Sequence, residues 1–576
     1  MKPIIVKVLL ALCIFFSIIL VILSLETKYE VEQVNVSEND LDNWSLENSV
    51  LNGASLLENK NIYKEENPGE ITKLYVTVFP TEEESGNVLD FSAFDLHSAL
   101  NKEYNPELNA NVVFGDADGN LSQVANTDIV NASIRVRGNS SRGATFKSYK
   151  INLKNESMAF YGQSVLNLNK HPNDIIKVTN KFSMDMMQPI ENMVGFRTNF
   201  MLVYIRDASL PEEEQEYKYY GLFTHIEQPN KTFLRVRGLD ENASLYKAEN
   251  FEFRVSEELK NIDDPEYDEA LFETVLEIRE GNNHEKLLKM LEDVNDMNQD
   301  FSQVFSTYFN EDNYLTWLAC NILLGNEDTI AHNFILYNPL NSMTWYMLPW
   351  DYDGTFQFGK YESSYSAPDS LKGIQRLTGV MLHRRYFRIE GNLNKLTNKI
   401  QELRETAFTK ERVDSLIAQY KPVLEETMTS YPDVLLTYMP PNEMNGYLDQ
   451  FYEQIEENYE EYLSSIEYPM PMFVSEPVKN ADGSTYFAWE PSYDIQGELI
   501  TYGITLARDY ERKDIVFAED NLAETNYTFT KTLPSGTYYL AITATDQSGN
   551  TQYSLDHYRY RENSIYKFGV REVVLE

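Results

Sequence analysis

The hydrophobic pattern of this chain changes its period twice, and the order of these changes restricts the folds open to it. Between Leu74 and Ile226, short runs alternate apolar and polar residues as β-strands do. From His284 to Ile466, the apolar residues recur at the spacing of amphipathic helices. After Pro471 the period of two returns. Because strands and helices do not alternate, the sequence predicts an α+β domain, β-rich first and helical second, followed by a small β-sandwich.

Individual elements can be placed from the same pattern. Strands are predicted at Leu74–Phe79, Val112–Phe114, Ala132–Arg137, Ser148–Leu153, Phe200–Ile205, Tyr219–Ile226, Asn333–Tyr337 and Trp345–Leu348. Helices are predicted at Met184–Met193, Asn313–Leu324, Lys395–Phe408, Glu411–Met428 and Glu443–Ile466. Near the C-terminus, strands are predicted at Tyr486–Trp489, Ile500–Leu506, Tyr527–Phe529 and Thr537–Ala544. The spacing of these last strands and of their turns resembles that of a fibronectin type III-like module.

An uncharged apolar run covers Val8–Leu25, which as a helix is about 27 Å long, enough for one hydrocarbon core. Lys2 and Lys7 precede it, so the N-terminus is expected to stay in the cytoplasm and the rest outside. We therefore expect a bacterial cell-membrane protein with one signal-anchor helix; a cleaved signal peptide is the alternative. The predicted division is an anchor at 1–25, a polar and acidic linker at 26–71, the main domain at 72–468 and the sandwich at 471–568.

Composition excludes some functions. The chain has 49 basic and 90 acidic side chains, a net charge of −41, and such a surface repels nucleic acids. Its two cysteines are Cys13, in the apolar run, and Cys320, in a predicted buried helix. No disulfide is therefore expected outside the membrane, which fits a bacterial extracytoplasmic protein.

A short loop between two predicted strands carries small and basic residues. The loop is RGNSSRG, from Arg137 to Gly143, and it includes Gly138, Asn139, Ser140 and Ser141. Small residues let backbone N–H groups approach an anion closely. On the following strand, alternation separates Lys150 from its apolar neighbours, and Lys147 lies nearer the loop. The pattern fits a nucleotide-binding loop with its lysine, and it also fits an ordinary hairpin.

Two acidic segments follow the helical part. In GNEDTIAHNFILY, Asp328 precedes Asn333 by five residues, the spacing of a kinase catalytic loop. In WYMLPWDYDG, Asp351 follows Asp328 by 23 residues and ends a predicted strand, where kinases carry a metal-binding aspartate. Asp353 is a second carboxylate there, and a calcium-binding or turn-capping pair is the alternative.

Together these segments resemble the family of the spore coat protein H (CotH) kinases, over roughly Leu74 to Ile466. The motifs that carry the resemblance are RGNSSRG with KSYKINL, YYGLFTHIEQPNKTFL, GNEDTIAHNFILY and LPWDYDGTF. The resemblance implies a two-lobed, atypical protein-kinase-like fold that transfers phosphate from ATP to serine or threonine of a surface or coat protein. The cofactors it implies are ATP and Mg²⁺, with Mn²⁺ or Ca²⁺ as alternatives.

The resemblance also implies roles for single residues. Asp328 would be the catalytic aspartate, and Asn333 and Asp351, with Asp353, the metal ligands. Lys150 or Lys147 would pair with the phosphates, and Glu227 would lie beside the nucleotide at the hinge. Two other functions stay open. One is a non-catalytic pseudokinase that binds surface or coat proteins, and the other is a glycoside hydrolase that uses Asp328 with Asp351 or Asp353.

Overall fold

The computed structural model describes residues 53–575 apart from 65, 84–85, 101–103, 117, 123–124, 139, 155–158, 173, 357–366, 438–439 and 561–564. The predicted anchor at 1–25 and the predicted linker up to residue 52 lie outside the described residues, as does Asn139. In the part of the chain that is described, no helix is both long and apolar enough to cross a membrane. The anchor helix therefore stays a prediction.

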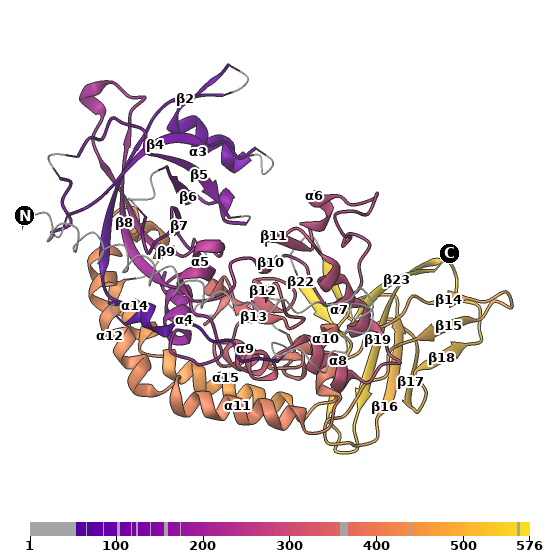
Figure 1. The fold of residues 1–576 in the computed structure, drawn as a ribbon. Coiled ribbons are helices and arrows are strands. Elements are labelled where there is room, and N and C mark those ends of the chain that lie inside the picture. Colours follow the sequence, from indigo (N-terminus) through magenta and orange to yellow (C-terminus); the bar gives the residue numbers. More distant parts are fainter. Residues whose placement is uncertain are drawn as a thin grey trace, which may run out of the picture. The chain divides into compact units, whose positions relative to one another are not determined.

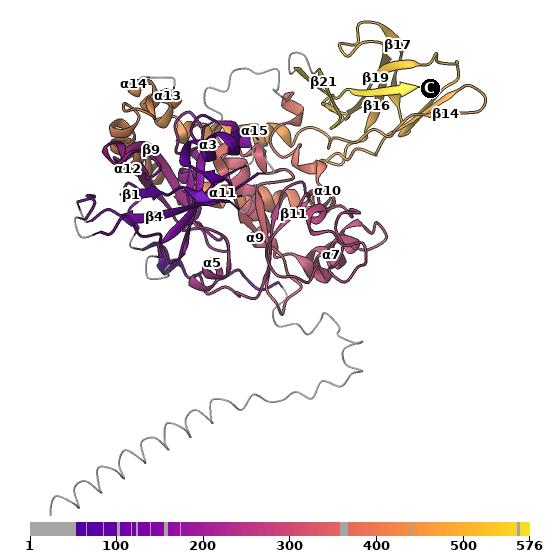
Figure 2. The same ribbon diagram turned by 90° about the horizontal axis from the view of Figure 1, so that it is seen from above.

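The first part of the domain is a closed β-barrel (Figures 1 and 2). Around it run β1 (Ile71–Val78), β4 (Leu108–Phe114), β5 (Ala132–Arg137), β6 (Ser148–Leu153), β7 (Val165–Asn169), β9 (Lys218–Ile226) and β8 (Thr198–Asp207). Strands β1 and β8 close the barrel as a parallel pair, and the other pairs are antiparallel. The predicted strands Ala132–Arg137 and Ser148–Leu153 are confirmed with the same bounds.

Alternation along β5 and β6 decides which side chains face the barrel interior. Ile134, Val136 and Ile151 belong to the buried barrel core, together with Phe94 of α3 (Phe91–Leu100). The residues between them, which include Lys150, therefore project from the outer face. A small hairpin of β2 (Thr81–Glu82) and β3 (Val88–Leu89) precedes α3.

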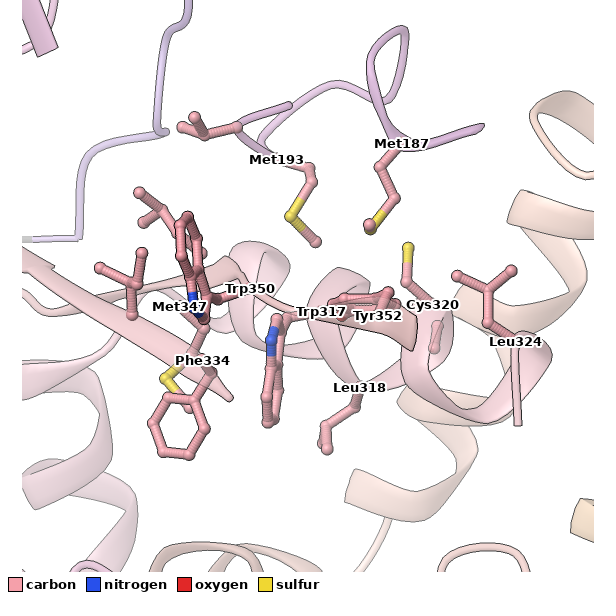
Figure 3. Close-up of a cluster of buried hydrophobic side chains, with 14 of the residues drawn as sticks. Met187, Met193, Trp317, Leu318, Cys320, Leu324, Phe334, Met347, Trp350 and Tyr352 are labelled. Atoms are coloured by element: carbon pink, nitrogen blue, oxygen red, sulfur yellow. The ribbon is translucent and has the colours of Figure 1, made fainter. Parts of the chain in front are cut away.

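A second sheet and the helices follow, as the sequence predicts. The sheet has the order β11 (Leu276–Glu280), β10 (Ser244–Ala248), β12 (Phe334–Asn338) and β13 (Tyr346–Pro349). Helix α9 (Glu311–Leu323) packs on β13 and on α11 (Asn392–Thr406) and α15 (Phe451–Ser465). Figure 3 shows Trp317, Leu318 and Cys320 of α9 beside Phe334, Met347 and Trp350 of the sheet region, all buried. The hydrophobic effect thus fixes the β12–β13 hairpin on α9.

The remaining helices surround this core. They are α4 (Thr179–Met187), α5 (Lys231–Val236), α6 (Glu269–Phe272), α7 (Glu285–Asn295), α8 (Phe301–Tyr308), α10 (Met381–Phe387), α12 (Lys410–Thr427), α13 (Val434–Thr437) and α14 (Pro441–Leu448). Helix α4 ends before Pro189, which cannot continue it, so the predicted helix Met184–Met193 lies about one and a half turns too late in the sequence. The predicted helix Glu443–Ile466 is divided between α14 and α15.

Residues 53–70 do not stand off from the domain as a linker would. The side chain of Leu56 is buried in the main core, and the Glu58 carboxylate forms an ion pair with Arg237, 2.9 Å from its Nε. The predicted linker, which ends at residue 71, therefore extends too far into the domain. Its polar residues are fixed by buried charge pairs, and such pairs leave no periodic pattern in the sequence.

Two sheets share one core in the C-terminal region. One contains β14 (Val478–Lys479), β15 (Thr485–Ala488) and β18 (Asn526–Phe529). The other contains β17 (Ile515–Leu522), β16 (Thr501–Ala507) and β19 (Gly536–Thr545), with β20 (Thr551–Tyr553) and β23 (Arg571–Leu575) both paired to β19. A separate pair is β21 (His557–Tyr560) with β22 (Ile565–Phe568). Trp489 and Leu540 pack between the two sheets, as in a β-sandwich. The likeness to fibronectin type III modules stays a prediction.

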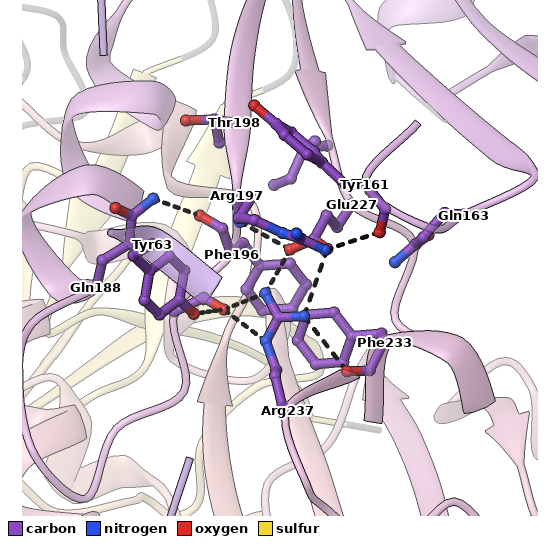
Figure 4. Close-up of polar contacts among 12 residues, drawn as sticks. Tyr63, Tyr161, Gln163, Gln188, Phe196, Arg197, Thr198, Glu227, Phe233 and Arg237 are labelled. Carbon is purple, nitrogen blue, oxygen red and sulfur yellow. Dashed lines mark hydrogen bonds and ion pairs between the residues drawn. The ribbon is translucent and has the colours of Figure 1, made fainter. Parts of the chain in front are cut away.

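A buried ion network ties the barrel to the helical part (Figure 4). Glu227, fully buried just after β9, accepts hydrogen bonds from Arg197 N at 2.8 Å and Arg197 Nε at 2.9 Å. The guanidinium group of Arg237, after α5, is paired with both Glu227 and Glu58. Burial raises the pKa of Glu227, but the two guanidinium groups outweigh it and hold that pKa below its ordinary value.

We predict that Glu227→Gln lowers the free energy of unfolding by about 3–5 kcal/mol, because two guanidinium groups lose their shared buried counter-charge. Urea unfolding of the purified protein measures this change. In a double-mutant cycle with Arg237→Met, the two losses are expected to be far from additive. Additive losses would contradict a direct coupling between the two side chains.

Candidate functional site

The β12–β13 hairpin brings two of the predicted site residues side by side. Phe334 pairs with Pro349 in the antiparallel register, so Asn333 precedes one strand where Asp351 follows the other. Both residues have left-handed backbones, with φ of 58° for Asn333 and 55° for Asp351. Residues other than glycine rarely adopt this conformation, and it is concentrated at functional sites.

Asp328 lies against the same hairpin, in the single 3₁₀ turn Glu327–Thr329 that follows α9. Its Oδ2 accepts a hydrogen bond from Asn333 Nδ2 at 2.7 Å, and its Oδ1 lies 2.8 Å from His332 Nε2. The hydrogen bond with Asp328 raises the pKa of His332. The side chain of Asp328 is 47% exposed, so the carboxylate can be reached from solvent while its orientation is fixed.

The turn that carries Asp351 and Asp353 is in contact with Asp328. This 3₁₀ turn, Tyr352–Gly354, passes so close that a Cβ on Gly354 would lie 2.8 Å from the Cβ of Asp328. The ring of Tyr352 is buried beside Cys320 and Met187 (Figure 3). Its backbone N–H donates to Asn180 Oδ1 on α4 at 3.3 Å. Helices α4 and α9 therefore position the two aspartates jointly.

The two carboxylates lie among both like and unlike charges. Burial raises the pKa of Asp351 to about 6, and the neighbouring Asp353 acts in the same direction. His171, buried in the loop between β7 and α4, has its Nδ1 3.5 Å from Asp353 Oδ2. Its Nε2 has no hydrogen-bond partner among the described residues. The guanidinium group of Arg137 acts against the rise in the pKa of Asp351.

The predicted nucleotide-binding loop, Arg137–Gly143, follows strand β5 of the barrel. The described part of the loop is the 3₁₀ turn Ser140–Gly143, preceded by Gly138 at φ 90°. A Cβ on Gly138 would lie 2.2 Å from Ser141 Oγ, so both the conformation and the space require glycine here. Arg137 donates a hydrogen bond to Asn169 Oδ1 on β7 and lies near Asp351.

Lys150 and Lys147 have different surroundings. Burial lowers the pKa of Lys150 to about 8, and Arg135, Arg279 and Arg137 act in the same direction. Among the described residues, none forms an ion pair with Lys150. Lys147 is buried, donates to the backbone oxygen of Ala144, and lines a pocket of about 560 Å³ between α3, β8 and β9. Of the two lysines that the sequence leaves open, Lys150 is the one that lies with Arg137.

Glu227 is not available as a ligand through its side chain, because its carboxylate belongs to the buried network with Arg197 and Arg237. The backbone of Glu227 directly follows β9. The residue before it, Ile226, accepts a hydrogen bond at its backbone oxygen from Asn167 Nδ2 of β7, at 3.3 Å.

The donor set is suited to a hard divalent cation. Asp351, Asp353 and Asn333 offer carboxylate and amide oxygens, the ligands that Mg²⁺ and Ca²⁺ prefer. Because Asn333 Nδ2 donates to Asp328, the oxygen of the same amide is left free to accept a further partner. The mutual repulsion of the two aspartates is also what a bound cation would relieve. In the described ranges, no three His, Cys, Asp or Glu side chains converge as a metal cluster.

The fold and the site define a class: an α+β protein in which a β-rich part precedes helices, with Asp328, Asn333 and Asp351 gathered at one hairpin. The chain belongs to the family described as CotH kinase protein, whose sequence model matches residues 134–469. It is 24% identical to the inner spore coat protein H of Bacillus subtilis (strain 168) over 318 residues, which are 54% of this chain and 75% of that protein. The resemblance found in the sequence is thereby confirmed, and the chain is a kinase-like protein related to a spore coat protein.

Several residues of this region were not predicted from the sequence. His171, Lys247 and Arg279 come from three separate segments, and no local motif marks them. His332 was not predicted either, although it lies four residues after Asp328 within GNEDTIAHNFILY.

We predict that Gly354→Ala destabilises the protein by about 1–3 kcal/mol, since the new methyl group must displace the Asp328 side chain at its Cβ or shift its own turn. Gly446→Ala is the matched control. Gly446 lies in α14 with no atom within 4 Å of the added Cβ, so alanine is expected to stabilise the helix by about 0.5–1 kcal/mol. Urea unfolding of both variants provides the comparison. Equal effects would mean that the close approach to Asp328 is not present.

Proposed function

We propose that this protein transfers the γ-phosphate of ATP to a serine or threonine hydroxyl of a protein substrate. The observation that carries the proposal is the hydrogen bond between Asn333 and Asp328 beside the Asp351 turn, on one face of the β12–β13 hairpin. Phosphoryl transfer needs little covalent chemistry from the protein, and its main requirements are position and charge. This hairpin supplies both.

Asp328 is the residue that orients the attacking hydroxyl and receives its proton. Its two oxygens are fixed by His332 and Asn333, and its exposure allows a substrate side chain to reach it. The carboxylate accepts both hydrogen bonds, so its remaining lone pairs are directed away from these two donors.

Asp351, Asp353 and the Asn333 amide oxygen are the groups that would hold a divalent cation, Mg²⁺ first and Mn²⁺ or Ca²⁺ as alternatives. When bound, such a cation neutralises charge on the phosphate oxygens. His171 keeps Asp353 in place, and Arg137 holds a positive charge near Asp351.

The proposed substrate is a surface or coat protein. The support is the name of the Bacillus subtilis relative, an inner spore coat protein, and the acidic surface, which argues against nucleic acid as a partner. If the protein is instead a non-catalytic binding protein, no phosphate-transfer assay should detect labelling of any substrate.

We expect different defects from the two aspartates. Asp351→Asn removes an anionic ligand, so it should weaken magnesium-ATP binding and lower phosphate transfer by about a thousandfold. Asp328→Asn should leave the affinity nearly unchanged and lower turnover by about 10²–10⁴-fold, because only the hydroxyl loses its base. Calorimetric titration with magnesium-ATP and labelling with radioactive ATP measure the two quantities.

Asp414→Asn, an exposed aspartate of α12 paired with Lys410, is the matched control and should behave as wild type. Chelation of divalent cations should abolish transfer by the wild type. If wild type neither binds ATP nor labels any protein with magnesium, manganese or calcium, the kinase proposal is wrong.

We also propose that the chain is held in the cell membrane by residues 8–25, with the folded domain outside. Protease added to intact cells should then remove the domain, while a cytoplasmic marker stays intact. Complete protection of the domain would overturn this topology.

A further inference from the structure

Five cationic side chains from two separate sheets lie in one region of the domain, and two of them, Arg137 and Lys247, lie near Asp351. Arg135 and Arg137 of β5 and Lys150 of β6 project from the outer face of the barrel, where Arg135 is the register partner of Lys150. Lys247 of β10 and Arg279 of β11 come from the second sheet. Acidic side chains outnumber basic ones by 41 in this chain, so five cations in one region are not expected by chance.

Arg279 connects this cluster to the acidic turn. Its guanidinium carbon lies 5.9 Å from the ring centroid of Trp350, the residue before Asp351. One terminal nitrogen donates to Glu277 at 2.8 Å, whereas Nε is buried and has no partner among the described residues. Arg279 also lies close enough to Lys150 to contribute to the lowering of its pKa.

Such a cluster costs stability unless an anion completes it. Like charges repel, and a buried donor without an acceptor loses its hydration without compensation. Most of the five cations have a carboxylate nearby: Lys247 and Arg279 pair with Glu249 and Glu277, Arg135 lies 3.9 Å from Glu107, and Arg137 lies near Asp351. Lys150 is the exception, because it has no ion-pair partner within the described part of the chain. Arginine forks match phosphate oxygens in geometry as well as in charge.

We infer that Arg279 is a phosphate-binding residue, and that it completes with Lys150 and Arg137 a site for a chain of phosphates that spans the barrel and the second sheet. The inference rests on the proposed function, because it assigns these three side chains to the phosphates of ATP. It goes beyond the sequence motifs, in which the phosphates are held only by the barrel loop and its lysine.

The test is calorimetric titration of the full chain, solubilised in detergent, with ATP, with inorganic tripolyphosphate and with adenosine, each in the presence of magnesium. Arg279→Met should weaken the binding of ATP and of tripolyphosphate about tenfold or more and leave adenosine unchanged. Arg279→Lys, which keeps the charge but not the fork, should lie between wild type and Arg279→Met. If Arg279→Met melts far below wild type, Arg279→Gln takes its place in the comparison.

Arg254→Met is the matched control. Arg254 resembles Arg279 in two ways: it pairs with the glutamate two residues before it, Glu252, and its guanidinium carbon lies 5.4 Å from an aromatic ring centroid, that of Phe473. Its loss should leave all three affinities unchanged. Wild-type affinity of Arg279→Met for ATP and tripolyphosphate would overturn the inference, as would the absence of tripolyphosphate binding by wild type.

The inference and the proposed function can fail separately. Tripolyphosphate binding that is lost in Arg279→Met, together with no phosphate transfer to any protein, would support the phosphate site and refute the kinase. Phosphate transfer that Arg279→Met retains at wild-type affinity would refute the phosphate role of Arg279 and support the kinase.

Discussion

The buried carboxylate of Glu227 is the point on which the rest of the domain depends. It is shared by Arg197, just before β8, and Arg237, just after α5, and Arg237 is held in turn by Glu58. A charge so deeply buried is tolerated only when every partner is in place, so the network admits one arrangement of these segments. The end of β9, the start of β8 and the segment around Glu58 are thereby fixed together.

A second buried pair holds the other end of the same face. Lys170, which follows β7, pairs with Asp433 at 2.7 Å, and Asp433 also accepts the N–H of Leu222 at 2.8 Å. A Cβ on Gly221 would lie 2.6 Å from the Asp433 oxygens, so glycine is required where the helical part meets β9. Lys170 is the residue before His171. The ion pair therefore fixes the loop that keeps His171 against Asp353, and the acidic turn is positioned from the barrel as well as from α9.

Elements of the fold could be predicted where residues close together in the sequence determine them, and could not where distant segments determine them. The strands β5 and β6 were predicted with correct bounds because period-two alternation separates the barrel core from the outer face. Strands β10 and β11 were missed, because they are short and their pattern is weak without the pairing to β12. Residues 53–70 were expected to be a linker, since polar residues fixed by buried ion pairs have the composition of a linker.

The candidate site divides in the same way. Asp328, Asn333 and Asp351 could be found from the sequence because a single hairpin with short connections brings them together, and spacing along the chain then predicts proximity in space. Arg279 and His171 could not, because they arrive on strands and loops whose neighbours are set by the barrel closure and the second sheet. In this protein the residues proposed to do chemistry on the hydroxyl are local, whereas those proposed to hold the phosphates are assembled from both sheets. A nucleotide bound there would therefore contact both parts of the domain, and its binding free energy would stabilise their relative placement as well as the site itself.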